Sequence, residues 1–404
     1  MSITMAPDFN SRSFLIKHID SILEFYETNV DDPNGGFYQN FKDDGQRYDQ
    51  DIRHLVSSTR FIYNYARTYI QFGREIDLDR VSSGLSFLRN KHKNPKTGGY
   101  AWLIKVTDQE LDILDDANHC YGMAFVMLAY SWAYRAGVKE AKNYLDEIWL
   151  LMEKHFWDNS SGLYKDEFCA EFKQCQSYRG QNSNMHTCEA LIAAYQATDD
   201  TKYLDRAYLI ADNIVNRQTK STDGLIWEHY SQDWTIDWEY NKQDPKNLFK
   251  PWGFQLGHQT EWAKLLLIIN QYKNRPWLLK RAQQLFDKAL ASAWDNKNDG
   301  ICYSVSPTGE ICDGDKYFWV QAESIVAAAL LADASGDPKY NEWYKKIWSY
   351  SWTHLIDHQY GAWYRVLNKQ NQKLSDCKSP IGKTDYHTMG ACYDLLAMYK
   401  GLID

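Results

Sequence analysis

One short pattern, a glycine followed by an alternating aromatic segment such as GGFYQNF, GGYAWLI or YGAWYRV, occurs six times along this chain of 404 residues. The glycines are Gly36, Gly99, Gly162, Gly224, Gly300 and Gly361. They are separated by 63, 63, 62, 76 and 61 residues, an evenness not expected by chance. The chain is therefore predicted to consist of six copies of one structural unit.

Each unit has the same internal order. An amphipathic helical pattern comes first, as in residues 141–156 and 278–294, and the glycine–aromatic segment follows it. The period-2 alternation of that segment predicts a short strand or hairpin. A second helix, richer in Ala and Leu and poorer in charge, completes the unit; examples are residues 185–197, 260–271 and 322–334. Two helices per unit predict twelve helices in all.

The difference in polarity between the two helices predicts how the units assemble. The less polar helix must be buried on most sides, whereas the amphipathic helix needs burial on one side only. A closed double ring satisfies both, so the prediction is an all-α fold, an (α/α)6 barrel, formed as a single domain by residues 1–404. We expect the hairpins and the first residues of the inner helices to gather at one end of this barrel, around a cavity.

The fourth interval between glycines is longer than the others, and the excess lies in residues 231–249, SQDWTIDWEYNKQDPKNLF. Long loops in compact domains are often functional. We interpret this insert as a loop over the mouth of the cavity, where Trp234 and Trp238 could close it around a single sugar ring.

Composition excludes several classes of function. A net charge of −8 argues against a nucleic-acid surface, and no apolar run is long enough to span a membrane. The N-terminal sequence MSITMAPDFNSRS does not resemble a signal peptide. The eight cysteines are scattered without a C-x-x-C pair and indicate reduced thiols, so a cytoplasmic location is expected. Whether the protein is a monomer or a homo-oligomer stays open.

The first residues of the six inner helices supply the candidate functional groups. The stretch 250–270, KPWGFQLGHQTEWAKLLLIIN, places His258 and Glu261 three residues apart, on one helical face that continues into an apolar interior. The third inner helix repeats the H-x-x-E pattern with His186 and Glu189, and the sixth carries His387. Glu189 and Glu261, one turn deeper than a histidine, could orient it or hold a substrate hydroxyl. The same level of the repeat holds further candidates for contact with a substrate: Arg60, Tyr121, Asn182, Trp319 and Gln321.

Histidines at the starts of helices are often structural, and we assign His54 and His119 to that class. His186, His258 and His387 differ because three imidazoles would face one cavity, which favours a catalytic role. Histidine titrates near neutral pH and so suits moving a proton to and from a carbon beside a carbonyl.

Three alternatives to a catalytic site built on histidines are a metal site, a glycoside hydrolase and a non-catalytic sugar-binding protein. Three histidines could bind zinc, but di-iron bundles use Glu-x-x-His, the reverse order, and no H-E-x-x-H is present, so no metal and no cofactor are expected. A glycoside hydrolase would need two carboxylates at a set separation, for which Asp115, Glu189, Glu261 or Glu323 would have to serve. A non-catalytic sugar-binding protein would need only the aromatic cavity.

The segments GHQTEWAKLLL, NMHTCEA and FWVQAE, together with the helix that begins at Tyr386-His387, resemble the N-acylglucosamine 2-epimerase superfamily over essentially the whole chain. Within it, the chain looks most like the aldose–ketose isomerases, the group of the mannose and sulfoquinovose isomerases. The resemblance implies an (α/α)6 barrel that works without a metal, with His186, His258 and His387 at its centre. It also implies that Arg60, Asn182, Glu261 and Trp319 contact the substrate.

The expected reaction interconverts a free hexose and its 2-ketose, with D-mannose and D-fructose as the favoured pair. His387 is expected to be the base and His258 the acid that moves a proton between two oxygens. His186 is expected to assist ring opening or to stabilise the enediolate, with Arg60 stabilising the developing oxyanion. A 2-epimerase is the alternative, since His258 and His387 could also flank carbon 2 from opposite faces. The choice of isomerase rests on the resemblance of GFQLGHQTEWAKLLL and RHLVSSTRF to the monosaccharide isomerases.

Overall fold

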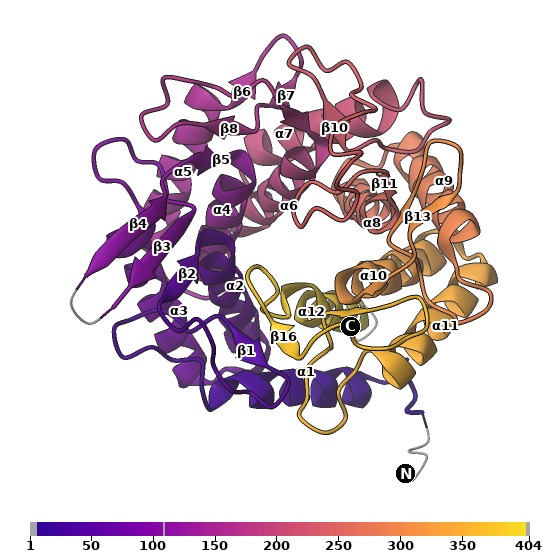
Figure 1. Ribbon diagram of the computed structural model, residues 1–404, viewed down its shortest axis with the longest axis horizontal. Helices are drawn as coiled ribbons and strands as arrows, with labels where there is room; N and C mark the ends of the chain where they lie inside the picture. Colours follow the sequence, from indigo (N-terminus) through magenta and orange to yellow (C-terminus); the bar gives the residue numbers. More distant parts are fainter. Residues whose placement is uncertain (1–5, 108–109, 401–404) are drawn as a thin grey trace.

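The computed structural model describes residues 6–107 and 110–400, and within them it contains the twelve predicted helices. Six helices form an inner ring and six an outer ring around it (Figure 1). The inner helices are α2 (Leu55–Phe72), α4 (Cys120–Arg135), α6 (Gln181–Thr198), α8 (Leu256–Lys273), α10 (Phe318–Ser335) and α12 (Tyr386–Lys400). The outer helices are α1 (Arg12–Glu27), α3 (Glu75–Phe87), α5 (Ala141–His155), α7 (Thr201–Asp212), α9 (Pro276–Ala293) and α11 (Pro338–His354).

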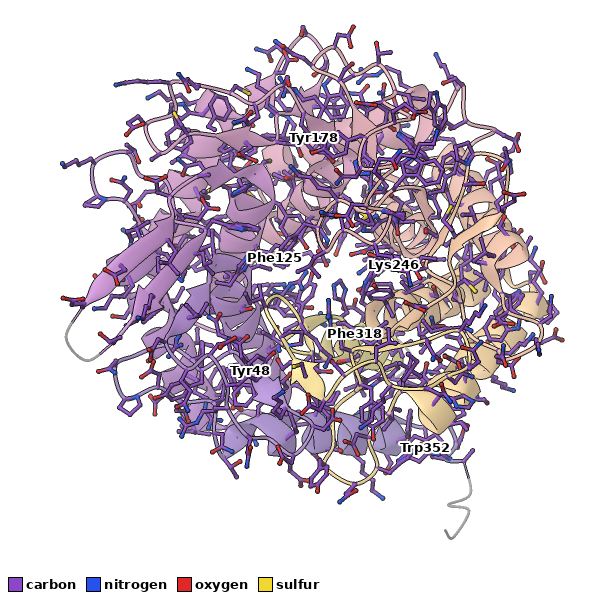
Figure 2. The ribbon with its side chains drawn as sticks, in the orientation of Figure 1. Tyr48, Phe125, Tyr178, Lys246, Phe318 and Trp352 are labelled. Carbon is purple, nitrogen blue, oxygen red and sulfur yellow. The ribbon has the colours of Figure 1, made fainter. Side chains whose placement is uncertain are left out.

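The inner ring is closed. Each inner helix contacts the next one along the chain, from α2 to α12, and α12 contacts α2 again. Helix α1 packs on α12, so the first outer helix covers the last inner one. Side chains near the middle of the ring, such as Phe125 and Phe318, come from inner helices, whereas Trp352 of α11 lies at the edge of the molecule (Figure 2). The (α/α)6 barrel predicted from the repeats is thereby confirmed.

The burial of the helices follows their composition. Helix α10 is Ala- and Leu-rich, and most of its residues from Phe318 to Leu331 are buried. The outer helix α9 buries a single stripe, Leu278, Arg281, Ala282, Leu285, Phe286, Ala289, Leu290 and Ala293. This is the one-sided burial expected of an amphipathic helix. The inner helices begin about four residues earlier than the apolar pattern indicates, because their first turns carry the polar groups of the site.

Short antiparallel strands connect neighbouring repeats at one end of the ring by pairing with one another. The strand before each inner helix pairs with a strand of the next repeat, so most strands do not pair within their own repeat. The pairs around the ring are β2 (Ile52–His54) with β3 (Leu103–Val106), β5 (Asn118–His119) with β8 (Glu167–Phe168), β9 (Arg179–Gly180) with β10 (His229–Tyr230), β11 (Phe254–Gln255) with β12 (Ser304–Val305), β14 (Lys316–Tyr317) with β15 (Val366–Leu367), and β16 (Cys377–Ser379) with β1 (Phe41–Lys42). The last pair joins the final repeat to the first and closes the ring.

Four further strands complete the set in the described residues. Strand β4 (Leu111–Asp115) extends β3, β13 (Ile311–Asp313) extends β12, and β6 (Trp157–Asp158) pairs with β7 (Leu163–Tyr164).

The repeated glycines explain the sharp entry into the glycine–aromatic segments. Gly300 and Gly361 have φ of 83° and 82°, and a Cβ at either would overlap the ring of Tyr350 or the carbonyl oxygen of Ser21. Only glycine adopts this backbone without strain.

Two expectations from composition concern membrane-spanning helices and the state of the cysteines. Across the described residues, no helix combines the length and apolar character needed to cross a membrane. All eight cysteines, which lie within the described ranges, are free thiols.

Candidate active site

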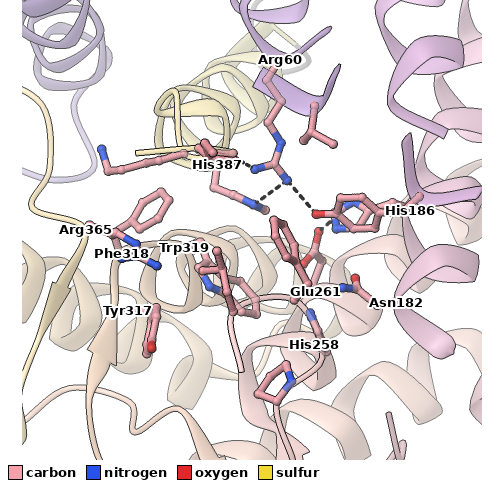
Figure 3. Close-up of a pocket in the computed structure, with 18 of the residues that line it drawn as sticks. Arg60, Asn182, His186, His258, Glu261, Tyr317, Phe318, Trp319, Arg365 and His387 are labelled. Atoms are coloured by element: carbon pink, nitrogen blue, oxygen red, sulfur yellow. Dashed lines mark hydrogen bonds and ion pairs between the residues drawn. The ribbon is translucent and has the colours of Figure 1, made fainter. Parts of the chain in front are cut away.

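A cavity opens at the end of the ring where the inner helices begin, and every inner helix contributes to its wall (Figure 3). The residues from the helices are Val56 and Arg60 of α2, Tyr121 of α4, Asn182 and His186 of α6, His258 and Glu261 of α8, Phe318 and Trp319 of α10, and His387 of α12. Loop residues complete the rim: Leu248, Phe249, Pro251, Tyr303, Tyr317, Arg365, Ile381, Gly382 and Lys383.

Each of the three histidines is held by a carboxylate at Nδ1. His186 Nδ1 lies 3.0 Å from Oε2 of Glu189, and His258 Nδ1 lies 2.9 Å from Oε2 of Glu228. His387 Nδ1 lies 2.6 Å from Oε1 of Glu323. A carboxylate at Nδ1 favours the tautomer that carries its proton there, which leaves the Nε2 lone pair as the proton acceptor.

His387 has the environment of a base. Its Nε2 lies 3.5 Å from Nη2 of Arg60, and a guanidinium can only donate, so Nε2 must be the acceptor. Burial lowers the pKa of His387 well below its usual value, and the charge of Arg60 and the proximity of His186 lower it further. The imidazole is therefore neutral at neutral pH.

Arg60 is fixed before any substrate arrives. Its Nη1 donates to the carbonyl oxygen of Gly382, and its Nη2 lies 3.1 Å from the hydroxyl of Tyr121. The guanidinium also stacks on Phe125 and Tyr386, at 4.4 and 4.7 Å from the ring centroids. A cation held in this way is preorganised to stabilise negative charge that develops in the cavity.

Trp319 separates two of the histidines. Its ring centroid lies 5.0 Å from that of His258 and 5.7 Å from that of His387, tilted by 34° and 36°. His186 lies 6.3 Å from His387, centroid to centroid, and packs against Tyr121 at 5.0 Å. The three imidazoles thus line one cavity, with an aromatic surface between His258 and His387.

Glu261 is a buried carboxyl group without hydrogen bonds to the described protein residues, and its nearest charged-pair contact is His186 Nδ1, 4.0 Å from Oε1. It is 1% exposed, and neither of its oxygens has a hydrogen-bond partner among the described residues. Burial and the neighbouring Glu323 raise its pKa well above the usual value, although Lys264 opposes that rise. A neutral carboxylic acid that faces a cavity can donate a hydrogen bond to a substrate oxygen.

Two groups of side chains in the described residues have the composition of metal ligands. His186, Glu189 and Glu261 form one group and Glu261, Glu323 and His387 the other, with ligand atoms within 4.8 Å of one another in each. The ammonium of Lys264 lies 2.6 Å from Glu323 and 3.7 Å from Glu189. A lysine cation thus sits beside carboxylates of both groups, where a metal ion would otherwise balance the charge.

The cavity brings together most residues predicted from the sequence. His186, His258, His387, Arg60, Tyr121, Asn182, Glu261 and Trp319 all line it. Glu189 does not appear in the wall; it lies behind His186 and holds its Nδ1. His54 proves structural, since it caps α2 by accepting a hydrogen bond from the backbone N–H of Val56.

Gln321 was predicted to bind substrate, and this is wrong. It is fully buried away from the cavity, where its amide oxygen accepts from the backbone N–H of Ile301 and its NH₂ donates to the Ile301 carbonyl. Both polar groups are therefore used to hold the glycine–aromatic segment of the fifth repeat. Gln321 comes two positions after the cavity residue Trp319, and a spacing of two residues is more than half a helical turn. Its side chain therefore lies on the side of α10 that faces this segment.

The insert of residues 231–249 does reach the mouth of the cavity, but through different side chains than expected. Trp234 packs on Tyr230 and Trp238 on Trp227, at centroid distances of 5.4 and 4.6 Å, and neither lines the cavity. Leu248 and Phe249, which are 54% and 43% exposed, face it instead. Lys246 forms ion pairs with Asp313 at 3.1 Å and Asp315 at 2.5 Å, which tie the insert to the fifth repeat.

Several residues of the site were not predicted. Glu228 holds His258 from the segment after Gly224, and nothing in its sequence context marks it. Lys264 could have been noticed, because a lysine within the apolar run WAKLLLIIN of an inner helix must find a buried partner. The rim residues Tyr303, Tyr317, Phe318, Arg365 and Lys383 meet the cavity only through the tertiary fold.

Comparison with known proteins agrees with this architecture. The family model for N-acylglucosamine 2-epimerase (GlcNAc 2-epimerase) matches residues 36–391. The D-mannose isomerase of Marinomonas mediterranea is 51% identical over 391 residues, which cover 96% of this chain and 98% of that protein. A crystal structure of a D-mannose isomerase matches with a TM-score of 0.95 at 50% identity, covering 97% of this chain and 100% of that one.

A more distant structure shares the fold alone. The cellobiose 2-epimerase from Bacillus thermoamylovorans matches with a TM-score of 0.84 at 19% identity, over 96% of this chain and 100% of that one. The family match spans far more than half of the chain, and the similarity to the Marinomonas mediterranea isomerase extends over nearly all of it. The chain is an isomerase and belongs to the N-acylglucosamine 2-epimerase family.

Proposed function

We propose that this protein is an aldose–ketose isomerase that interconverts D-mannose and D-fructose without a metal ion. The observation that carries the proposal is the set of three imidazoles, each with Nδ1 on a carboxylate, that line one cavity together with Arg60. The names of two relatives, D-mannose isomerases at 51% and 32% identity, support mannose as the substrate.

The first step opens the sugar ring. A cyclic hexose has no free carbonyl group, so a proton must be supplied to the ring oxygen before carbon 2 becomes acidic. We assign this step to His186, which faces the cavity beside Tyr121 and has Glu189 at its Nδ1. Its Nε2 can accept the proton of the carbon 1 hydroxyl and pass it to the ring oxygen, which opens the ring and leaves the carbonyl group at carbon 1. The carboxyl group of Glu261, without hydrogen bonds to the described residues, is available to bind a hydroxyl of the opened chain.

The second step moves two protons and the carbonyl group. His387 Nε2 takes the proton from carbon 2, which gives a cis-enediolate with its negative charge on oxygen 1. His387 then returns its proton to carbon 1 as the hydroxyl proton leaves oxygen 2, so the carbonyl moves to carbon 2 with no net change in atoms. We assign the transfer between the two oxygens to His258 and the stabilisation of the oxyanion to Arg60.

The experiment that tests this proposal is NMR of free sugars with the enzyme in deuterated water. With mannose, fructose is expected as the main product, with deuterium entering at carbon 1 wherever the base exchanges its proton with solvent. Glucose that accumulates before fructose would identify a 2-epimerase. Cleavage of an oligosaccharide would identify a glycoside hydrolase, and binding without turnover of any sugar would identify a non-catalytic protein.

Metal independence has its own test. Two of the carboxylates that could bind a divalent ion, those of Glu189 and Glu323, already lie beside the Lys264 ammonium, and histidines can carry the protons. Prolonged treatment with EDTA is therefore expected to leave the rate of mannose isomerisation unchanged. Activity that disappears with EDTA and returns with zinc or manganese would contradict this.

A cytoplasmic location stays a prediction, with which eight free thiols are compatible.

A further inference from the structure

Lys264 occupies an unusual place for a lysine. It lies in α8, one turn after Glu261 and within the run WAKLLLIIN, and is 4% exposed. Its ammonium forms an ion pair with Glu323 Oε2 at 2.6 Å and lies 3.7 Å from Glu189 Oε1. It does not line the cavity, so it cannot touch a substrate that binds there.

The lysine connects two of the three histidines through their carboxylates. Glu189 uses Oε2 for His186 and turns Oε1 toward Lys264, whereas Glu323 uses Oε1 for His387 and Oε2 for Lys264. The chain of contacts therefore runs from α6 through α8 and α10 to α12. One buried cation holds the carboxylates of two imidazoles that face the same cavity.

Electrostatics keep this cation charged. Burial alone would lower the pKa of Lys264, but Glu323, Glu189 and Glu261 together raise it well above the usual value. Burial would likewise raise the pKa of Glu189, yet Lys264 and His186 hold it well below its usual range. Burial raises the pKa of Glu323, and Lys264 opposes that rise.

We propose that Lys264 is a positioning residue that keeps Glu323 and Glu189 ionised and oriented, and thereby keeps the Nε2 of His387 free to accept a proton. The proposal deepens the isomerase function above and rests on it for its kinetic test. An ionised Glu323 must accept the Nδ1 proton of His387. A protonated Glu323 would instead donate to Nδ1, and the imidazole proton would move to Nε2, where it could not accept the proton of carbon 2.

The other ionisable groups near Glu323 and His387 cannot replace the lysine. Arg60 faces His387 from the cavity side, where its charge favours the Nδ1 tautomer but reaches neither oxygen of Glu323. The remaining groups add negative charge or lie beyond the carboxylates; they are Glu261, Tyr386, His186 and Asp394. Without Lys264, the buried carboxylates of Glu323 and Glu189 would have no adjacent ammonium, and the loss of that charge would favour their protonated forms.

The test compares Lys264→Met with Lys264→Arg and with a matched control. Lys316 is an equally buried lysine, 2.6 Å from the carboxylate of Asp295, and it does not line the cavity. Lys316→Met should lose stability but keep the kcat of the folded enzyme. Lys264→Met should lower kcat for mannose by about 10²-fold or more with little change in KM. Lys264→Arg, which restores the cation, should recover a large part of that loss.

A spectroscopic measurement separates positioning from mere stability. In ¹⁵N NMR of histidine-labelled enzyme, with His387→Gln to assign the signal, wild-type His387 should carry its proton on Nδ1. In Lys264→Met the proton should move to Nε2. An unchanged kcat in a folded Lys264→Met variant, or an unchanged tautomer, would overturn the proposal.

If Lys264→Met does not fold, the spectrum of the wild type still tests the proposal. A proton on Nε2 of His387 in the wild type would overturn it. The same spectrum separates the proposed role of Lys264 from the proposed isomerase activity. If the wild type converts no sugar, the isomerase function fails, while the tautomer of His387 in wild type and variant still decides the role of Lys264.

Discussion

The chemical role of each histidine depends on its two ring nitrogens and on what they meet. His92 is buried with Nδ1 at 3.0 Å from the carbonyl oxygen of Ala101 and Nε2 at 3.1 Å from the hydroxyl of Ser58, so both nitrogens are used by the fold. His387 and His258 instead place one nitrogen on a carboxylate and line the cavity. His92 can therefore serve as the control when His387 and His258 are mutated.

Replacing either proposed proton carrier should abolish most of the activity. His387→Ala and His258→Ala are each expected to lower kcat/KM for mannose by about 10²–10⁴-fold, the usual contribution of general acid–base catalysis, while the protein still folds. Steady-state kinetics with circular dichroism on the same samples measure both quantities. His92→Gln, the control, should cost stability and leave kcat near wild type. Near-wild-type activity in either cavity variant would contradict the assigned roles.

The pH dependence of the reaction should reflect the lowered pKa of His387. A base works only when it is unprotonated, and burial together with Arg60 holds the pKa of His387 well below 6.5. Activity should therefore persist below pH 6.5 and fall only when the pH drops through the lowered pKa. In Arg60→Gln, loss of the positive charge should raise that pKa and move the acid limb of kcat/KM toward higher pH. An acid limb that stays in place would show that the limb belongs to another group.

At the scale of the elements, amide side chains of inner helices hold the glycine–aromatic segments by the same arrangement in several repeats. Asn184 of α6 binds both backbone groups of Tyr164, Gln259 of α8 those of Ile226, and Gln321 of α10 those of Ile301. In the second repeat, Asn118 accepts from the N–H of Tyr100. Each bond fixes the angle at which a segment enters the cavity end of the barrel.

This arrangement predicts a structural rather than a catalytic effect of mutating Gln321. Gln321→Leu would leave the buried N–H and C=O of Ile301 without partners, at a cost of about 1–3 kcal/mol for each group. The variant should therefore unfold at a lower denaturant concentration than the wild type while its KM for mannose at low temperature stays the same. Urea titrations and initial rates test this. A raised KM with unchanged stability would restore the role in substrate binding that the sequence suggested.

At the scale of the whole molecule, the first and last repeats meet at a buried seam. Tyr26 of α1 donates to Asp385 at 2.6 Å, just before α12, and Trp363 Nε1 donates to Nε2 of His18 at 2.7 Å. The hydroxyl of Tyr344 donates to the carbonyl oxygen of Phe9 at 2.7 Å. Since these contacts join residues more than 300 positions apart, we expect the ring to unfold as one cooperative domain, with a single calorimetric transition.

The seam should make the stability of the protein depend on pH. Burial lowers the pKa of His18 to about 4, whereas the unfolded chain binds the proton near pH 6.5. As the pH falls from 6.5 to about 4, only the unfolded state gains this proton, so the free energy of unfolding should fall by about 3 kcal/mol. A protonated His18 could also no longer accept from Trp363.

The corresponding variant is His18→Gln, which keeps an acceptor but cannot titrate. Its free energy of unfolding, measured by urea titration between pH 4 and 8, should fall less steeply on acidification than that of the wild type. His155→Gln, at a half-buried histidine on an outer helix, is the control and should retain most of the wild-type slope. Identical slopes for His18→Gln and the wild type would show that the seam does not sense pH.

Much of the fold was determined by the sequence, because local periodicity decides which faces of an element are apolar. Six evenly spaced glycines and two kinds of helix require a closed ring, since only a ring buries every inner helix between two neighbours. The position of His186, His258 and His387 near the starts of inner helices placed them at one end of that ring. For the same reason eight of the residues that line the cavity could be predicted, all of them on inner helices.

What only the tertiary structure decided are the contacts between side chains that lie far apart in the sequence. Glu228 reaches His258 across 30 positions and Glu323 reaches His387 across 64, and no local pattern encodes either distance. Gln321 has the right level in its helix but the wrong face, and in the insert Phe249 rather than Trp238 meets the cavity. Helix rotation and loop path decide these details, because they are set by packing around the closed ring and not by the residues of any one repeat.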